Sequence, residues 1–183
     1  DIYSTLQDAM KTAMSGKKGP VVVDLVKDIF SQDVEVKDFQ PIQSAVSSSL
    51  TLDNIISRIT SSKRPVIVSG GGVKHSGAET ELFEFTKKSN IPVVDTMMGL
   101  GTYPQDDENY FGMIGIFGDK AANQLIKDSD LIISLGARFN DRITCMFKDV
   151  NLSEKFVQVD INPDEISKNI TASDFAVADI KQV

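Results

Sequence analysis

Short runs of branched apolar residues recur along this chain and limit its fold more than any other feature. The five clearest runs are Val21–Val26, Pro65–Ser69, Ile91–Val94, Leu131–Leu135 and Phe156–Val159. Their apolar residues are continuous rather than alternating, which is typical of strands buried on both faces. A helical pattern separates most of the runs, and residues 175–178 resemble a sixth strand. The sequence therefore predicts an α/β, doubly wound, mainly parallel six-stranded sheet flanked by helices.

A change of composition divides the chain. Residues 31–49 hold Ser, Gln, Asp and Pro with few large apolar residues, as a linker would. We predict three segments: residues 1–31 as the tail of a preceding domain, residues 32–50 as a linker, and residues 51–183 as the main domain. Because the first residue is aspartate rather than methionine, we expect a piece of a longer protein.

Charge and cysteine content narrow the function class. A net charge of −7 without a basic cluster argues against nucleic-acid partners and against an anionic membrane surface. No apolar run approaches the roughly 20 residues that span a bilayer. Cys145 is the single cysteine and His75 the single histidine, and they lie on different segments. We therefore expect a cytoplasmic protein with no disulfide, no metal site and no catalytic groups of its own.

Glycines follow the second apolar run, at the strand end where ligands bind in doubly wound sheets. Gly70, Gly71 and Gly72 allow either a close approach of backbone to a phosphate or an ordinary tight turn. The dinucleotide fingerprint is incomplete, because its last glycine position holds His75. The S-x-x-E sequence from Ser76 predicts a capping box that starts the next helix.

Acidic residues follow two further runs. Asp95 and Asp160 either bind a ribose hydroxyl or cap a strand end in solvent, and for Asp95 we favour the solvated cap. Met97 and Met98 fit core filler better than a cofactor wall. Glu165 is explained as part of a helix start with Asn162 as N-cap. The glycine-broken segment 111–118 matches neither strand nor helix periodicity.

Two arginines follow the run that ends near Gly136. Arg138 and Arg142 share one face if the segment begins a helix, and their planar forks suit phosphate oxygens. An internal salt-bridge cluster with Asp141 and Asp149 explains the same residue types equally well. Residue types alone leave both interpretations open.

Six ordered blocks of sequence carry a resemblance to a known family. They are GPVVVDLVKD, PVIVSGGGV, IPVVDTMMGLGTYP, FGMIGIFGDKAAN, SDLIISLGARFNDR and VQVDINPDEISKN. Together they resemble the catalytic subunits of acetolactate synthase. The resemblance implies the end of a pyrimidine-binding domain over residues 1–31 and a central FAD-binding-type domain over residues 51–183.

The same resemblance implies the chemistry of the intact enzyme. Pyruvate is decarboxylated on thiamine diphosphate and joined to a second pyruvate or to 2-oxobutanoate, while Mg²⁺ holds the diphosphate. The residues for that step lie outside this chain, so the resemblance implies a fragment that is inactive alone. The implied partners are the remaining domains, a second copy in a homodimer or homotetramer, and a regulatory small subunit.

The central domain of this family holds FAD as a structural cofactor, and the resemblance implies its contacts. They are Gly70, Gly71, Gly72, Thr96, Met97, Met98, Gly115, Gly136, Ala137, Arg138, Asp141, Arg142, Ile143, Asp160, Ile161, Glu165, Asp179 and Ile180. Two positions depart from the family: Phe117 replaces a common histidine, and Asp95 replaces a common threonine. The alternatives are a cofactor-free structural and dimerisation domain of another thiamine diphosphate enzyme, and a free-standing NAD or ADP binder.

Overall fold

The computed structural model describes residues 2–33 and 52–183, which fall into two compact units, Asp1–Ser47 and Ser48–Val183. The first unit contains helix α1 (Ile2–Met14) and the short 3-10 helix η1 (Lys27–Ser31). Most of the predicted linker lies outside the described residues. The assignment of residues 1–31 to a pyrimidine-binding domain stays a prediction.

The predicted strand over residues 21–26 is wrong. No described residue pairs with this segment, and its Val22 side chain is 93% exposed. A strand needs a neighbour that satisfies its backbone hydrogen bonds, and an apolar run by itself does not supply one.

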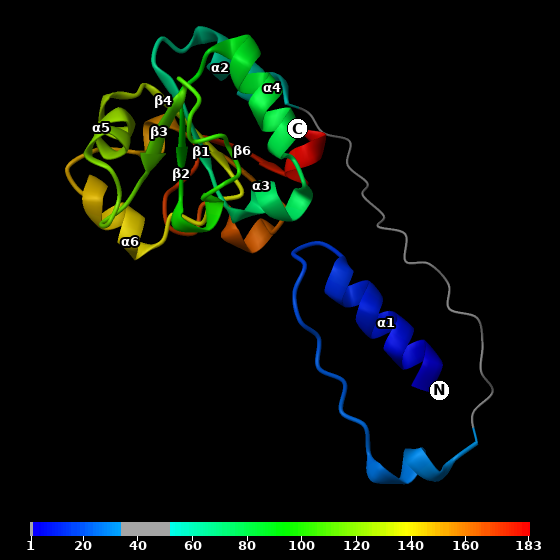
Figure 1. Cartoon of the computed structure of the whole chain (residues 1–183). Helices are drawn as coiled ribbons and strands as arrows, with labels where there is room; N and C mark the ends of the chain where they lie inside the picture. Colours follow the sequence, from blue (N-terminus) through cyan, green and yellow to red (C-terminus); the bar gives the residue numbers. More distant parts are fainter. Residues whose placement is uncertain (1, 34–51) are drawn as a thin grey trace. The chain divides into compact units, whose positions relative to one another are not determined.

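The second unit is built on a six-stranded sheet in the order β3-β2-β1-β4-β5-β6, with every neighbouring pair parallel (Figure 1). Its strands are β1 (Pro65–Ser69), β2 (Val93–Asp95), β3 (Tyr110–Met113), β4 (Leu131–Leu135), β5 (Phe156–Asp160) and β6 (Asp174–Val177). The prediction of a doubly wound parallel sheet is confirmed.

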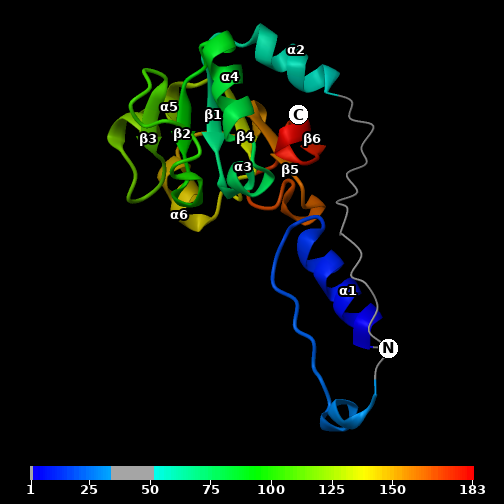
Figure 2. The same ribbon diagram turned by 45° about the vertical axis from the view of Figure 1, so that its right-hand side comes forward.

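Helices cover both faces of this sheet (Figures 1 and 2). One core lies on the side of α2 (Asp53–Ser61), α3 (Gly71–Ser76) and α4 (Glu79–Ser89). The other lies on the side of α5 (Lys120–Asp128) and α6 (Asp141–Thr144). Alternate residues of β1 serve the two cores, since Ile67 joins the first whereas Val66 and Val68 join the second. Burial on both faces explains the continuous apolar runs.

Short 3-10 helices complete this unit at loop positions. They are η2 (Met97–Gly99), η3 (Cys145–Phe147), η4 (Ser153–Lys155), η5 (Pro163–Glu165) and η6 (Ile180–Gln182).

Strand β3 was not predicted from the sequence. It is the sixth strand of the sheet in place of the strand expected over residues 21–26. It is an edge strand paired only with β2, so its residues are partly exposed and need not be continuously apolar. Gly112 within it has φ +96, and an added Cβ would clash with the Asp119 carboxylate. The glycine that broke the strand pattern is therefore required by the local backbone.

The predicted capping box is also wrong. Ser76 ends α3 instead of starting α4, and its hydroxyl donates to the carbonyl of Val73 at 2.9 Å. Gly77 then turns the chain with a left-handed φ of +66, and α4 begins at Glu79 without a side-chain cap. Three glycines disfavour a helix, so the sequence did not predict α3, and the start of α4 was expected at Ser76 instead of Glu79.

Candidate functional site

The predicted site residues lie at or just after the ends of all six strands. Because the strands are parallel, these positions gather at one edge of the sheet. We call the segments that follow the strand ends the carboxyl edge. It comprises residues 70–72 after β1, 96–98 after β2, 115 after β3, 136–143 after β4, 160–165 from the last residue of β5 onward, and 179–180 after β6. The chain order reverses between β1 and β4, the position at which doubly wound sheets bind ligands.

The glycine turns after β1 and β4 pack backbone against backbone. The amide of Gly70 donates to the Leu135 carbonyl at 2.9 Å, and the amide of Gly72 donates to the Gly136 carbonyl at 3.1 Å. A Cβ on Gly72 would lie 2.6 Å from the Gly136 Cα, closer than real structures allow. These contacts favour the tight-turn interpretation, since two of the three glycine amides already donate inside the protein.

Arg138 and Arg142 present unpaired charges at this edge. Both side chains are exposed, and within residues 2–33 and 52–183 neither guanidinium forms an ion pair. The predicted salt-bridge cluster is wrong, because Asp149 pairs with Lys127 at 3.1 Å. The Asp141 carboxylate accepts the backbone amide of Arg142 at 3.0 Å.

The prediction that Arg138 and Arg142 share one face of a helix is wrong too. Helix α6 begins at Asp141, so Arg138 lies before it, and the intervening Phe139 has a φ of +47. Phe139 is buried, as is Ala137, and the Arg138 carbonyl accepts the Asn169 side-chain amide at 2.8 Å. Packing of Phe139 therefore fixes the backbone that carries Arg138, and helical spacing does not.

Gly115 and α6 are brought together in the structure. The Ile116 amide donates to the Arg142 carbonyl at 2.9 Å, and a Cβ on Gly115 would lie 3.1 Å from that same oxygen. The buried Asn123 side chain accepts from the Gly115 amide at 2.9 Å and donates to the Gly115 carbonyl at 3.0 Å. Sequence reasoning missed Asn123, because a polar residue on the inner face of a helix gives no signal until its partner is known.

Large apolar side chains remain exposed on the segments after β2 and β3. Met97 is 54% exposed and Met98 71% exposed, so the expectation that they fill the core is wrong. On the segment after the neighbouring strand, Ile116 is 53% exposed and Phe117 is 75% exposed. These four side chains offer apolar surface at the same edge as the free arginines.

Asp95 is fully buried, which contradicts the expectation of a solvated cap. Burial raises the pKa of its carboxyl from 3.8 to about 7, and hydrogen bonding to Tyr110 and Thr102 lowers it only in part. Its Oδ2 has no hydrogen-bond partner among the described residues. Thr102 and Ser69 complete this buried polar group, and the sequence pointed to neither.

The Asp160 side chain accepts a hydrogen bond from the loop that follows it. It is 9% exposed rather than solvated, and its carboxylate accepts the Asn162 amide at 2.9 Å. The expected N-cap is confirmed, since the Asn162 side chain accepts the Asp164 amide at 3.2 Å, although the turn continues only as η5. Glu165 is buried and pairs with Lys168 at 3.2 Å, and Ile161 is half-buried.

The segment after β6, which includes η6, packs against α3. Asp179 caps η6 by accepting the Lys181 amide at 3.0 Å. The Lys181 ammonium group donates to the Gly77 carbonyl at 3.1 Å and pairs with Glu81 at 3.2 Å. Ile180 packs against the first core, so this segment supports the turn that contains the three glycines.

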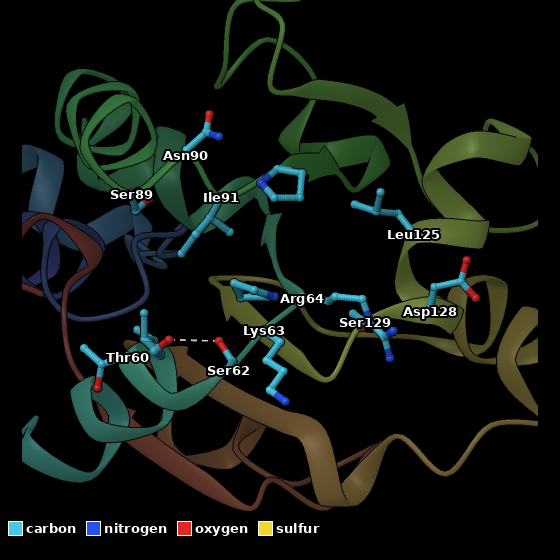
Figure 3. A pocket seen from close by; sticks show the side chains of 13 residues that line it. Thr60, Ser62, Lys63, Arg64, Ser89, Asn90, Ile91, Leu125, Asp128 and Ser129 are labelled. Carbon is cyan, nitrogen blue, oxygen red and sulfur yellow. Dashed lines mark hydrogen bonds between the residues drawn. The ribbon is translucent and has the colours of Figure 1, made fainter.

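A pocket of about 620 Å³ lies at the opposite edge of the sheet, where the strands begin (Figure 3). It is lined by Ile59, Thr60, Ser62, Lys63, Arg64, Pro65, Ser89, Asn90, Ile91, Pro92, Leu125, Asp128 and Ser129. None of the predicted site residues lines it. Its hydroxyl groups donate to carbonyls of their own helices, as Ser62 does to Ile59 and Ser129 does to Ile126.

The described parts of the chain contain no group of three His, Cys, Asp or Glu side chains that could hold a metal ion. No helix in those parts has the length and apolar character needed to cross a membrane.

Comparison with known proteins adds a family and several relatives. Residues 52–183 match the family described as thiamine pyrophosphate enzyme, central domain. The probable acetolactate synthase large subunit of Methanocaldococcus jannaschii is 36% identical over 193 residues, covering 100% of this chain and 32% of the relative. The acetolactate synthase large subunit of Haemophilus influenzae is 33% identical, with coverage of 100% and 33%. The chloroplastic acetolactate synthase of Arabidopsis thaliana is 35% identical, with coverage of 99% and 28%. The chain thus spans about a third of the length of these relatives.

Proposed function

Because this chain belongs to the family of thiamine pyrophosphate enzyme central domains, we propose that it is the central part of an acetolactate synthase and that its carboxyl edge binds FAD. One observation carries the cofactor proposal. Arg138 and Arg142 lie exposed and unpaired after β4, beside the point where the strand order reverses. A domain that only separates other domains has no need for two free arginines there.

The residues at the carboxyl edge fit a flavin nucleotide. The guanidinium groups of Arg138 and Arg142 suit the pyrophosphate oxygens, which accept charge-assisted hydrogen bonds from planar forks. The exposed side chains of Met97, Met98 and Phe117 offer apolar surface to a flat ring system. Burial raises the pKa of Asp95 to about 7, so this carboxyl places less negative charge near a pyrophosphate than an aspartate with the ordinary pKa of 3.8 would.

The remaining predicted contacts are part of this proposal. Gly70, Gly71, Gly72, Gly115 and Gly136 give space without side chains, whereas Asp160, Glu165, Asp179 and Ile180 hold the loops around it. In the synthase reaction the bound FAD undergoes no net redox change, so the role proposed for these residues is to bind and orient it.

The activity of the whole protein is proposed on the same basis. It would join two pyruvates, or pyruvate and 2-oxobutanoate, with release of CO2, for branched-chain amino acid synthesis. Thiamine diphosphate and Mg²⁺ would be held by other parts of the protein. Relatives named large subunits support a small-subunit partner, and we propose a cytoplasmic homodimer or homotetramer.

A cofactor-free structural domain is the second candidate, and one observation favours it. The amides of Gly70 and Gly72 are already hydrogen-bonded inside the protein, so the glycine turn has a structural explanation without a ligand. The two candidates differ in whether the chain binds FAD at all.

Isothermal titration of the chain with FAD, ADP and NAD tests the proposal. We expect saturable heat with FAD, weaker binding of ADP, and the weakest binding of NAD. No heat with any of the three would favour the cofactor-free candidate, and a preference for NAD would contradict the flavin site. Arg138→Ala should weaken FAD binding by about 1.5 to 3 kcal/mol if the guanidinium contacts a phosphate. Lys148→Ala removes another exposed cation, which lies outside the carboxyl edge, and should leave the affinity unchanged.

A further inference from the structure

Asp95, Ser69 and Thr102 form a buried polar group, which we call the acid cluster. Asp95 and Ser69 are 0% exposed and Thr102 is 1% exposed. Ser69 ends β1 and Asp95 ends β2, and the two are register partners in the sheet. The Thr102 hydroxyl lies 2.5 Å from the Ser69 hydroxyl and 3.4 Å from Asp95 Oδ1. The cluster therefore joins two strand ends to the loop that follows β2.

This cluster holds both ends of the turn over residues 96–102. At the start of the turn, the Thr96 amide donates to the Ser69 carbonyl at 2.9 Å. At its end, the Thr102 hydroxyl donates to the Gly99 carbonyl at 2.7 Å. Between them, Met98 lies so close to Gly71 that a Cβ there would be 3.2 Å from the Met98 Cβ. The position of Met97 and Met98 beside the glycine turn thus depends on the cluster.

The hydrogen-bond donors available around Asp95 favour the protonated form of its carboxyl. Thr102 has one hydroxyl hydrogen, and the Gly99 carbonyl at 2.7 Å takes it in preference to Asp95 Oδ1 at 3.4 Å. Asp95 Oδ2 has no partner in the described residues. An ionised carboxylate would be buried with this oxygen unpaired, and its interactions with the Tyr110 hydroxyl, the Thr102 hydroxyl and the Gly101 amide offset the cost of burial only in part. A protonated carboxyl can instead donate to a free lone pair of Thr102 Oγ1.

No nearby charge compensates an ionised Asp95. Among the described residues, Tyr110 on the neighbouring β3 is the titratable group that interacts with it, and no lysine or arginine contributes. The pKa of Tyr110 is itself raised to about 12 by burial and by Asp95, so this phenol is uncharged at neutral pH.

We propose that Asp95 is a positioning residue: its protonated carboxyl holds the turn over residues 96–102 against β1, and loss of the proton to solvent loosens that turn and displaces Met97 and Met98. The folded-state pKa of Asp95 lies above its ordinary value of 3.8, at about 7. The folded chain therefore keeps a proton that the unfolded chain loses above about pH 4, and it gives up that proton as the pH rises through 7. The proposal therefore predicts that the turn over residues 96–102 is held against β1 below about pH 7 and loosens above it.

Methyl NMR of the 183-residue chain labelled on its methionines tests this without any ligand. We expect the Met97 and Met98 signals, assigned with Met→Leu variants, to titrate together with a midpoint near pH 7, whereas Met10 and Met14 of the first unit stay constant. Asp95→Asn should abolish the transition and keep the low-pH positions. Asp106→Asn, which removes an exposed carboxylate from the loop before β3, should leave the transition intact. Met97 and Met98 signals that do not change across neutral pH in the wild-type chain would overturn the proposal, even if the Asp95 variant does not fold.

A second measurement concerns ligand affinity and rests on the proposed FAD site. FAD should bind roughly tenfold more weakly about 1 to 2 pH units above the transition than below it, and this difference should vanish in Asp95→Asn. Equal affinity on both sides of a transition seen by NMR would overturn the link between Asp95 and the cofactor site. Absence of FAD binding at every pH, with the methionines still titrating, would contradict the proposed function and leave the positioning role supported.

Discussion

Gly72 and Gly136 show at the scale of single residues why glycines at a strand end need not form a phosphate loop. Their backbones touch, and the φ of +60 at Gly136 favours glycine further. Sequence alone could place glycines near the site, but it could not tell whether they approach a ligand or one another. Asp95 illustrates the same limit, since its burial depends on a loop that folds back over it and on the Thr102 hydroxyl.

The contact between the two glycine turns predicts a contrast between neighbouring substitutions. Gly72→Ala places a methyl group 2.6 Å from the Gly136 Cα, so two backbones must separate, and we expect a loss of about 2 to 4 kcal/mol in the free energy of unfolding. Gly71→Ala meets the Cβ of the exposed Met98 at 3.2 Å and the Met98 carbonyl oxygen at 3.4 Å, contacts that need only a small shift, and should change that free energy by less than about 1 kcal/mol. Urea unfolding followed by circular dichroism measures both. Equal losses in the two variants would show that the close contact does not limit stability.

At the scale of elements, burial on both faces decided which strands the sequence revealed. The bounds of β1 and β4 were predicted as observed, because both strands are central and continuously apolar. The edge strand β3 was missed, and residues 21–26 were mistaken for a strand, because pairing rather than composition makes an edge strand. Helix ends were less predictable still: α4 starts after the left-handed turn at Gly77, and the end of α5 is capped by a side chain from a distant part of the chain.

Lys155 provides such a distant cap for α5. Its half-buried ammonium group donates to the carbonyls of Ile126, Lys127 and Ser129 at 2.9, 3.0 and 2.7 Å. Lys155→Met keeps the apolar stem but leaves the carbonyl end of the helix without this charge, so we expect a loss of about 1 to 2 kcal/mol on urea unfolding. Lys120→Met, at the exposed start of the same helix, should not destabilise the chain. A loss no larger than that of the control would contradict the capping role.

At the scale of the whole molecule, the parallel sheet gathers residues from six distant segments at one edge. The sequence predicted this gathering, because parallel strands share one carboxyl end and the candidate residues all follow strands. It did not predict the pocket at the opposite edge, which arises where α2, α4 and α5 end near the starts of β1, β2 and β4. The two edges offer competing locations for a ligand, and the proposed function requires the carboxyl edge.

Amide NMR of the chain titrated with FAD tests that requirement most directly, because it reports on both edges in one experiment. The proposed function predicts saturable shifts at Gly71, Gly115 and Arg138, with the pocket residues Arg64, Ile91 and Ser129 unchanged. Shifts confined to those pocket residues, or no shifts at all, would contradict an FAD site at the carboxyl edge.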